Sequence, residues 1–153
     1  MVVIDTDVFV LAFAFHRDNR QAINSHFLEV VRTYEPAITI YSVMKLLGQL
    51  SFNLSAERLA QWRGWLQDNF ALAVIYPATA NRTADEFFDS DLVKGPLQRM
   101  SRHPSPYLDS LILDLAEATE NVRAFVTWNA RHYQGRTSLR VMTPGEYVDS
   151  PPV

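Results

Sequence analysis

Short runs of apolar residues alternate along this chain with longer stretches in which apolar residues recur at helical spacing. Runs of this length are typical of buried strands, and the alternation with helices favours a parallel sheet. Strands are predicted at residues 2–5, 37–41, 72–76, 124–128 and 139–142. Helices are predicted at residues 8–15, 21–34, 42–52, 55–69, 83–102 in one or two pieces, and 106–120. The pattern therefore predicts an α/β fold with five strands and helices on both faces of the sheet.

Two helix starts carry local signals. Ser55 precedes Ala56 and Glu57, which is typical of an N-cap residue at the start of a helix. Ser105 followed by Pro106 suggests an N-cap with proline at the first helical position. Both signals agree with the helices that the apolar spacing predicts.

Composition sets limits on the class of protein. The chain has 153 residues, of which 48% are hydrophobic, and this size fits one domain over residues 1–153 with a substantial core. It has no cysteine, which excludes disulfides and cysteine-based zinc sites and makes a cytoplasmic location the natural expectation. The apolar run at residues 8–15 is too short to span a bilayer, so no membrane association is expected.

Two carboxylates stand between apolar segments near the start of the chain, in the stretch VVIDTDVFV at residues 2–10. If residues 2–5 form the central strand, Asp5 lies at its carboxyl end, where open α/β sheets place their ligand crevices. Asp7 then borders the same crevice. The alternative is that Asp7 caps the following helix and Asp5 is a solvated loop residue.

Other polar residues are expected at the same edge of the sheet. Asp109 lies in the first turns of a predicted helix, and Asn129 follows the fourth predicted strand. Carboxylates that converge repel one another, and the usual solution is a hard divalent cation with oxygen ligands. The sequence therefore predicts a site for Mg²⁺ or Mn²⁺ formed by Asp5, Asp109 and their neighbours.

With these motifs in view, the sequence resembles the PIN domains, especially the VapC-like toxin ribonucleases. VVIDTDVF is similar to their first strand, YLDSLILDLAEA to their acidic helix, FVTWNARHY to their fourth strand and VMTPGEYV to their last strand. The matches span about residues 2–148. The resemblance implies a PIN-like three-layer α/β/α sandwich with a central, mostly parallel five-stranded sheet. It also implies a metal-dependent endoribonuclease whose partner is an antitoxin protein.

The family's site residues carry over position by position. Asp5 matches the first acidic position, and Asp109 matches the acidic position on the later helix. Asn129 matches a position that is Asp or Asn in the family, with Thr127 as the neighbouring hydroxyl. Asp7 stands where Asn, Ser or Asp is common. The resemblance thus implies Asp5, Asp109 and Asp7 around a metal, with Thr127 and Asn129 beside the reacting water.

One position departs from the family pattern. The family leads us to expect Glu on the helix after the second strand, and the best register places Lys45 there. Either the Lys45 ammonium fills part of the metal site, or another carboxylate substitutes, or catalysis is lost. Candidates for a substitute lie in the segment DEFFDSD, whose more ordinary interpretation is a solvated helix face; its acidic residues are Asp85, Glu86, Asp89 and Asp91.

Arg131 and His132 follow Asn129 and could contact a substrate phosphate, since cationic side chains are natural phosphate partners. The alternative is a surface loop with ordinary charges. The formal net charge of −3 gives the chain no general attraction to RNA, so binding would depend on local groups or on a metal.

The sequence agrees with three different functions. The first is a metal-dependent ribonuclease, and the second is a PIN-fold binding or regulatory module that has lost catalysis because of Lys45. The third is a phosphatase of the haloacid dehalogenase type, since a DxD after a strand also opens that family. Phe9 stands where those phosphatases have Thr or Val, and their late acidic pair is absent.

The apolar content also bears on association. Helix faces such as YSVMKLLGQLSF carry more apolar residues than one small domain readily buries, so a homodimer or a complex with a small partner protein is expected. Trp62 and Trp65 are three residues apart, which is typical of core residues but also suits an interface.

Overall fold

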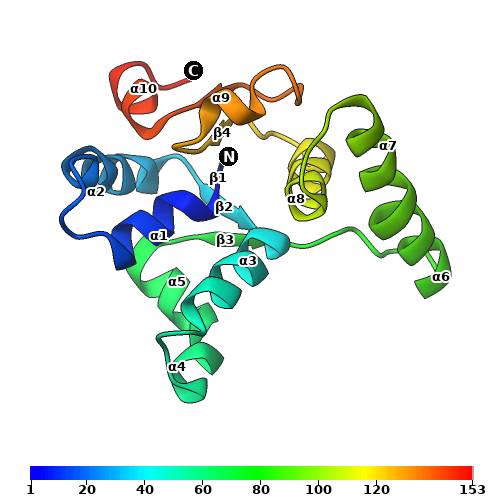
Figure 1. Ribbon diagram of the computed structural model, residues 1–153, viewed down its shortest axis with the longest axis horizontal. Coiled ribbons are helices and arrows are strands. Elements are labelled where there is room, and N and C mark those ends of the chain that lie inside the picture. The colour runs from blue at the N-terminus through cyan, green and yellow to red at the C-terminus, as the bar shows by residue number, and fades with distance from the viewer. Residues whose placement is uncertain (153) are drawn as a thin grey trace.

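Five strands form one sheet in the order β3-β2-β1-β4-β5 in a computed structural model, which describes residues 1–152 (Figure 1). All four pairings are parallel, so the sheet expected to be mostly parallel is entirely parallel. The five predicted strands are confirmed: β1 (Val2–Ile4), β2 (Pro36–Thr39), β3 (Ala73–Ile75), β4 (Ala124–Val126) and β5 (Val141–Met142).

Helices cover both faces of the sheet, which makes the expected PIN-like three-layer α/β/α arrangement. One buried cluster joins the sheet to α1 (Thr6–Ala14), α2 (Gln21–Val30), α3 (Ile40–Leu50), α5 (Trp62–Phe70) and α10 (Pro144–Asp149). The other joins its opposite face to α8 (Tyr107–Ala118) and α9 (Ala130–Tyr133). The short helix α4 (Ala56–Ala60) precedes α5, and a 3₁₀ turn, η1 (Val31–Thr33), follows α2.

Residues 83–102 form one helical arm packed against α8, in three consecutive pieces. These are α6 (Ala84–Phe87), the π-helical segment η2 (Phe88–Lys94) and α7 (Gly95–Arg102). Thr83 and Glu86 form a capping box that fixes where the arm begins. The prediction of one or two helices over residues 83–102 is thus correct in extent.

Several predicted boundaries need correction. The last strand is shorter than residues 139–142, because β5 pairs with β4 only through Val141 and Met142. The predicted helix 55–69 is interrupted at Gln61, which separates α4 from α5. The Ser55 cap is confirmed, whereas Ser105 does not cap α8: its hydroxyl contacts that of Ser110, and Pro106 is the cap residue.

The sheet order places a switch point between β1 and β4. From β1 the chain continues outward through β2 and β3, whereas β4 and β5 lie on the other side. Ile4 pairs with Val126, so the next residues, Asp5 and Thr127, leave the carboxyl edge of the sheet side by side. Ligand sites of open α/β sheets form at such a point. None of the helices within residues 1–152 is both long and apolar enough to cross a membrane.

Candidate functional site: a carboxylate cluster with a lysine

Asp5 begins the site at the end of β1. It is the N-cap residue of α1: its Oδ1 accepts a 2.7 Å hydrogen bond from the Thr6 amide, and the side chain is almost fully buried. Helix α1 therefore starts two residues earlier than the predicted residue 8. The alternative of a solvated Asp5 and a capping Asp7 is wrong, because the chain turns into the helix directly after the strand.

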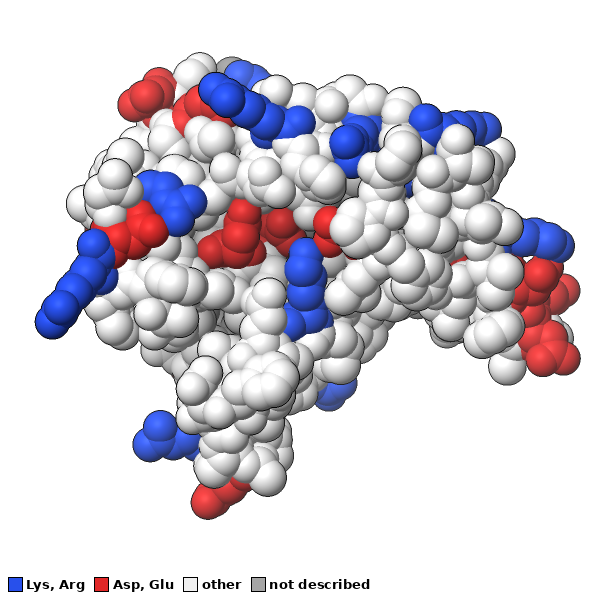
Figure 2. Space-filling view, in the orientation of Figure 1, with Lys and Arg blue, Asp and Glu red and all other residues white. Residues whose placement is uncertain are grey.

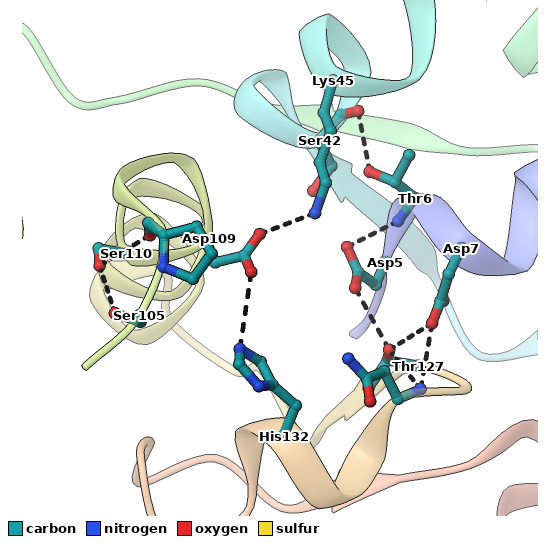
Figure 3. Close-up of polar contacts among 12 residues, drawn as sticks. Asp5, Thr6, Asp7, Ser42, Lys45, Ser105, Asp109, Ser110, Thr127 and His132 are labelled. Atoms are coloured by element: carbon teal, nitrogen blue, oxygen red, sulfur yellow. Dashed lines mark hydrogen bonds and ion pairs between the residues drawn. The ribbon is translucent and has the colours of Figure 1, made fainter. Parts of the chain in front are cut away.

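Asp7 lies in the first turn of α1 and faces the end of β4. Its Oδ2 is 2.8 Å from the Thr127 hydroxyl and accepts a 3.1 Å hydrogen bond from the Asn129 amide. The Thr127 hydroxyl is also 3.2 Å from Asp5 Oδ2. Since a hydroxyl has one hydrogen, Thr127 donates to one carboxylate at a time, and it joins the two (Figure 3).

Asp109 and Lys45 complete the cluster from α8 and α3. The Lys45 ammonium donates a 2.7 Å hydrogen bond to Asp109 Oδ1, and His132 Nε2 is 3.9 Å from Asp109 Oδ2 (Figure 3). The side chains of both members of the Lys45–Asp109 pair are shielded, with 27% and 10% of their surface exposed. Lys45 thus lies within the acidic crevice, where the family resemblance placed a glutamate.

Burial and mutual repulsion govern the charges here. Burial raises the pKa of Asp5, and burial together with the charge of Asp5 raises the pKa of Asp7 to about 7. Burial alone would lower the pKa of Lys45, but Asp5 and Asp109 outweigh it and hold that pKa above its usual value. At neutral pH the cluster therefore contains a firmly charged ammonium and a carboxyl, Asp7, that is close to its titration midpoint.

The remaining predicted residues lie along the same edge. Asn129 is exposed directly after β4, and the contact it makes with the cluster is through its backbone amide. Arg131 is exposed on α9. His132 faces Asp109 and is 3.5 Å from an Arg136 nitrogen. Segments far apart in the sequence thus bring side chains from β1, α1, α3, α8 and α9 and the end of β4 into one region; these are Asp5, Asp7, Lys45, Asp109, His132 and Thr127.

The oxygen atoms of the cluster suit a divalent ion in their chemistry. Asp5, Asp7 and Asp109 offer the carboxylate oxygens that Mg²⁺ and Mn²⁺ prefer, and Asp7 Oδ1 is buried without a hydrogen-bond partner. However, no group of three or more His, Cys, Asp or Glu side chains in residues 1–152 is already arranged around a common point. The oxygens fit such an ion, and the Lys45 ammonium is the group that it would displace.

The acidic segment on the arm does not supply the missing carboxylate. Asp91 pairs with Arg82, Asp89 pairs with Lys94, and Glu86 closes the capping box with Thr83. The partners of these three carboxylates lie on the arm or, for Asp91, directly before it, and Asp85 is exposed to solvent, so none of these interactions involves the cluster. The interpretation as a solvated helix face agrees with this placement.

Sequence reasoning missed Tyr133, which is buried beside the cluster. Burial, followed by the charges of Asp5, Asp109 and Asp7, raises the pKa of its hydroxyl and keeps it neutral. Its spacing in the sequence could have identified it, because Tyr133 lies four residues after Asn129, which is one helical turn further on.

A hollow adjoins the cluster on the Asp7 side. Figure 2 shows acidic and basic side chains meeting in a recess near the centre of one face of the molecule. A cavity of about 420 Å³ in this region is lined by Asp7, Lys45 and Asn129 together with aromatic and polar side chains. Asp7 is therefore reachable from solvent through a space of small-ligand size.

Solved structures with the same kind of fold are found by comparison. The chain is similar to one in the crystal structure of VapBC2 from Rickettsia felis bound to a DNA fragment from their promoter, with 19% identity, a TM-score of 0.61 and coverage of 94% of this chain and 98% of that one. It is also similar to a chain in the structure of FitAB bound to the IR36 DNA fragment, with 11% identity, a TM-score of 0.62 and coverage of 95% and 96%.

These likenesses establish a PIN-like fold over nearly the whole chain, and the resemblance to the PIN toxins is confirmed at that level. No family model matches the sequence, and no curated protein matches it significantly.

Proposed function

We propose that this protein is an endoribonuclease of the PIN/VapC toxin type that hydrolyses RNA phosphodiester bonds at the Asp5–Asp7–Asp109 cluster. The observation that carries the proposal is the convergence of three carboxylates from β1, α1 and α8 at the switch point of a PIN-like sheet. Burying three acids together costs stability, and a function at that point explains why the arrangement persists.

Asp5 and Asp109, with Asp7, would hold Mg²⁺ or Mn²⁺, which supplies Lewis-acid assistance to phosphodiester hydrolysis. Thr127 holds the Asp7 carboxylate in place through a 2.8 Å hydrogen bond. Asn129, with Thr127, would orient the attacking water. Arg131 and His132 would contact the substrate phosphate at the rim of the site.

A second function is favoured by one specific observation. The ion pair between Lys45 and Asp109 already neutralises a carboxylate that the nuclease would need for its metal. A PIN-fold binding or regulatory module without catalysis would retain such a pair permanently. In the nuclease, the same pair makes metal binding weak and cleavage slow.

Cleavage of structured RNAs, measured against Mg²⁺ and Mn²⁺ concentration, separates the two functions. The nuclease predicts slow, metal-dependent cleavage by the natural protein, faster cleavage at lower metal concentration by Lys45→Glu, and none by Asp5→Asn. The non-catalytic module predicts no cleavage by the natural protein at any metal concentration. Cleavage that persists in Asp5→Asn would reject this site altogether.

An antitoxin-type protein is the proposed partner, because the similar chains occur in VapBC2 and FitAB structures. Homodimerisation stays a prediction; it agrees with the exposed apolar side chains Phe52, Phe88 and Leu97, and light scattering at increasing concentration would test it. A cytoplasmic location is proposed with the toxin-like function.

A further inference from the structure

A second cavity, here called the amino-edge cavity, lies at the opposite end of the strands from the carboxylate cluster. Its walls include Val2 at the start of β1, Glu35 directly before β2, Arg123 directly before β4, and Tyr147 on α10. Its volume of about 260 Å³ is smaller than that of most sites for drug-sized ligands. The cavity is therefore separate from the proposed nuclease site and suits a small molecule.

The Tyr147 side chain carries an unused polar group at this cavity. The side chain is fully buried, yet its hydroxyl has no hydrogen-bond partner within residues 1–152. Edge-to-face contacts hold the ring, with its centroid 5.3 Å from that of Phe27 and 6.1 Å from that of Tyr34. Leaving a buried hydroxyl unpaired costs stability, and such groups in natural proteins usually have a partner.

The Tyr147 hydroxyl lies on the cavity side of its ring. Burial raises the pKa of Tyr147 to about 12; Tyr34 adds to this shift, and the positive charge of Arg123 opposes it. Both residues that act on the hydroxyl also line the cavity. Because its pKa is so high, the hydroxyl keeps its proton at neutral pH and can donate it in a hydrogen bond to an anion.

The cavity also contains a cation without a counter-ion. Arg123 is exposed and forms no ion pair with any side chain among residues 1–152. The acidic residue of the wall, Glu35, is 3.6 Å from the Met1 amino nitrogen, and 82% of its side-chain surface is exposed. The guanidinium and the Tyr147 hydroxyl thus make up a pair of hydrogen-bond donors that faces no acceptor of its own.

We propose that the amino-edge cavity binds a small organic carboxylate. The two oxygens of a carboxylate match the parallel N–H groups of the Arg123 guanidinium, and the Tyr147 hydroxyl donates to one of them. The carbon body of the ligand packs on the apolar part of the wall, which is formed by Val2, Tyr34 and Pro152. This site goes beyond the proposed nuclease function and does not depend on it.

Benzoate is the probe, because it joins a carboxylate to a small apolar ring. Two-dimensional amide NMR spectra of the full chain, titrated with millimolar benzoate, should show shifts at Val2, Glu35 and Arg123 and none at Asp109. Arg123→Gln and Tyr147→Phe should each raise the Kd by about tenfold, as expected for loss of a hydrogen bond to a charged group.

Tyr147→Phe also gives a test without any ligand. The change keeps the buried ring and removes only the unpaired hydroxyl, so the Tm without benzoate should rise. Benzoate should raise the Tm of the natural protein more than that of Tyr147→Phe, because binding to the folded state stabilises it. A lower Tm of Tyr147→Phe without benzoate would show that the hydroxyl already has a partner and would count against the site.

Arg140→Gln is the matched control, since Arg140 is also an exposed arginine but does not line the cavity. Its Kd for benzoate should equal that of the natural protein, and thermal melting checks the fold of each variant. Benzamide, the uncharged analogue, should bind far more weakly than benzoate. Equal binding of benzamide, tighter binding of inorganic phosphate, or an unchanged Kd in folded Arg123→Gln and Tyr147→Phe would overturn the proposal. None of these results bears on RNA cleavage, so the nuclease and this site stand or fall separately.

Discussion

Lys45 Nζ and Asp109 Oδ1 are 2.7 Å apart, and this pair joins α3 to α8 across the carboxyl edge of the sheet. Asp5 and Asp7 lie close enough to add to the charge that stabilises the ammonium. Lys45 is therefore the counter-ion of the cluster as well as an obstacle to a divalent cation.

Removing this counter-ion should destabilise the protein. In Lys45→Met, with a chelator present, the free energy of unfolding at pH 8 should fall by about 2–4 kcal/mol, because buried carboxylates lose their cation. At pH 5 the loss should be smaller, since the raised pKa values of Asp5 and Asp7 let these groups take up protons. Urea unfolding at the two pH values measures both effects.

Lys94→Met is the control for this change. Lys94 pairs with Asp89 on the arm, where 72% and 56% of the two side-chain surfaces are exposed. Exposed pairs contribute about 1 kcal/mol or less. Equal losses in Lys45→Met and Lys94→Met would show that Lys45 does not stabilise the cluster.

The same lysine should control the response to metal. Mn²⁺ at millimolar concentration should raise the Tm of Lys45→Glu by several degrees, because binding to the folded state alone stabilises it, while the natural protein should respond weakly. Differential scanning fluorimetry with Mn²⁺ and a chelator measures this without any RNA. Identical shifts for the two proteins would place Lys45 outside the set of groups that compete with the ion.

Asp7 should make stability depend on pH. Its pKa is raised from 3.8 to about 7, so the folded state favours the protonated form. Stability should therefore fall as pH rises from about 4 to 7 and stay level above that. Without metal, Asp7→Asn should remove this loss and be more stable than the natural protein at pH 8 by up to about 4 kcal/mol.

Chemical denaturation from pH 5 to 8 tests this, with Asp68→Asn as the control because Asp68 is exposed on α5. The Asp68 variant should follow the natural protein at every pH. If the stability of Asp7→Asn also follows that of the natural protein at every pH, the Asp7 carboxyl is ionised in the folded protein across this range and its pKa is not raised.

The chain's local patterns were sufficient to predict its sheet and the edge at which the site forms. Asp5 and Thr127 directly follow buried strands, and parallel pairing brings such positions together regardless of the conformation of the loops. Helix ends were harder, because they depend on competing partners. The Ser105 hydroxyl could cap α8 or contact Ser110, and nothing local decides between the two.

The interior of the site was only partly predictable. The register that placed Lys45 at the family's glutamate position came from resemblance, and in the structure the Lys45 side chain pairs with Asp109 in the crevice. The orientation of Trp128 depends on Asn24, which lies 104 residues away in sequence, so no local pattern could indicate it. Cavities such as the one beside Asp7 arise from packing between several elements and have no sequence signature of their own.

The contact between α7 and α8 supplies the last prediction. The Arg99 side chain, only 12% exposed, donates a 2.6 Å hydrogen bond from Nε to Asp114 and also pairs with Glu117. Its Nη1 donates to the Arg136 carbonyl oxygen at 2.7 Å. Arg99 therefore ties the arm to the helix that carries Asp109 and to the loop after α9.

Arg99→Met should lower the free energy of unfolding by about 2–4 kcal/mol, since it leaves Asp114 and Glu117 shielded without their cation. Backbone amides of α7 should exchange with deuterium faster, while those of β1 and β4 should not, because the sheet packs on other contacts. Arg82→Met removes a more exposed pair, between Arg82 directly before the arm and Asp91 on it, and should cost less than about 1 kcal/mol. If instead the two variants lose equal stability, or α7 keeps its protection in Arg99→Met, then apolar packing rather than Arg99 holds the arm against α8.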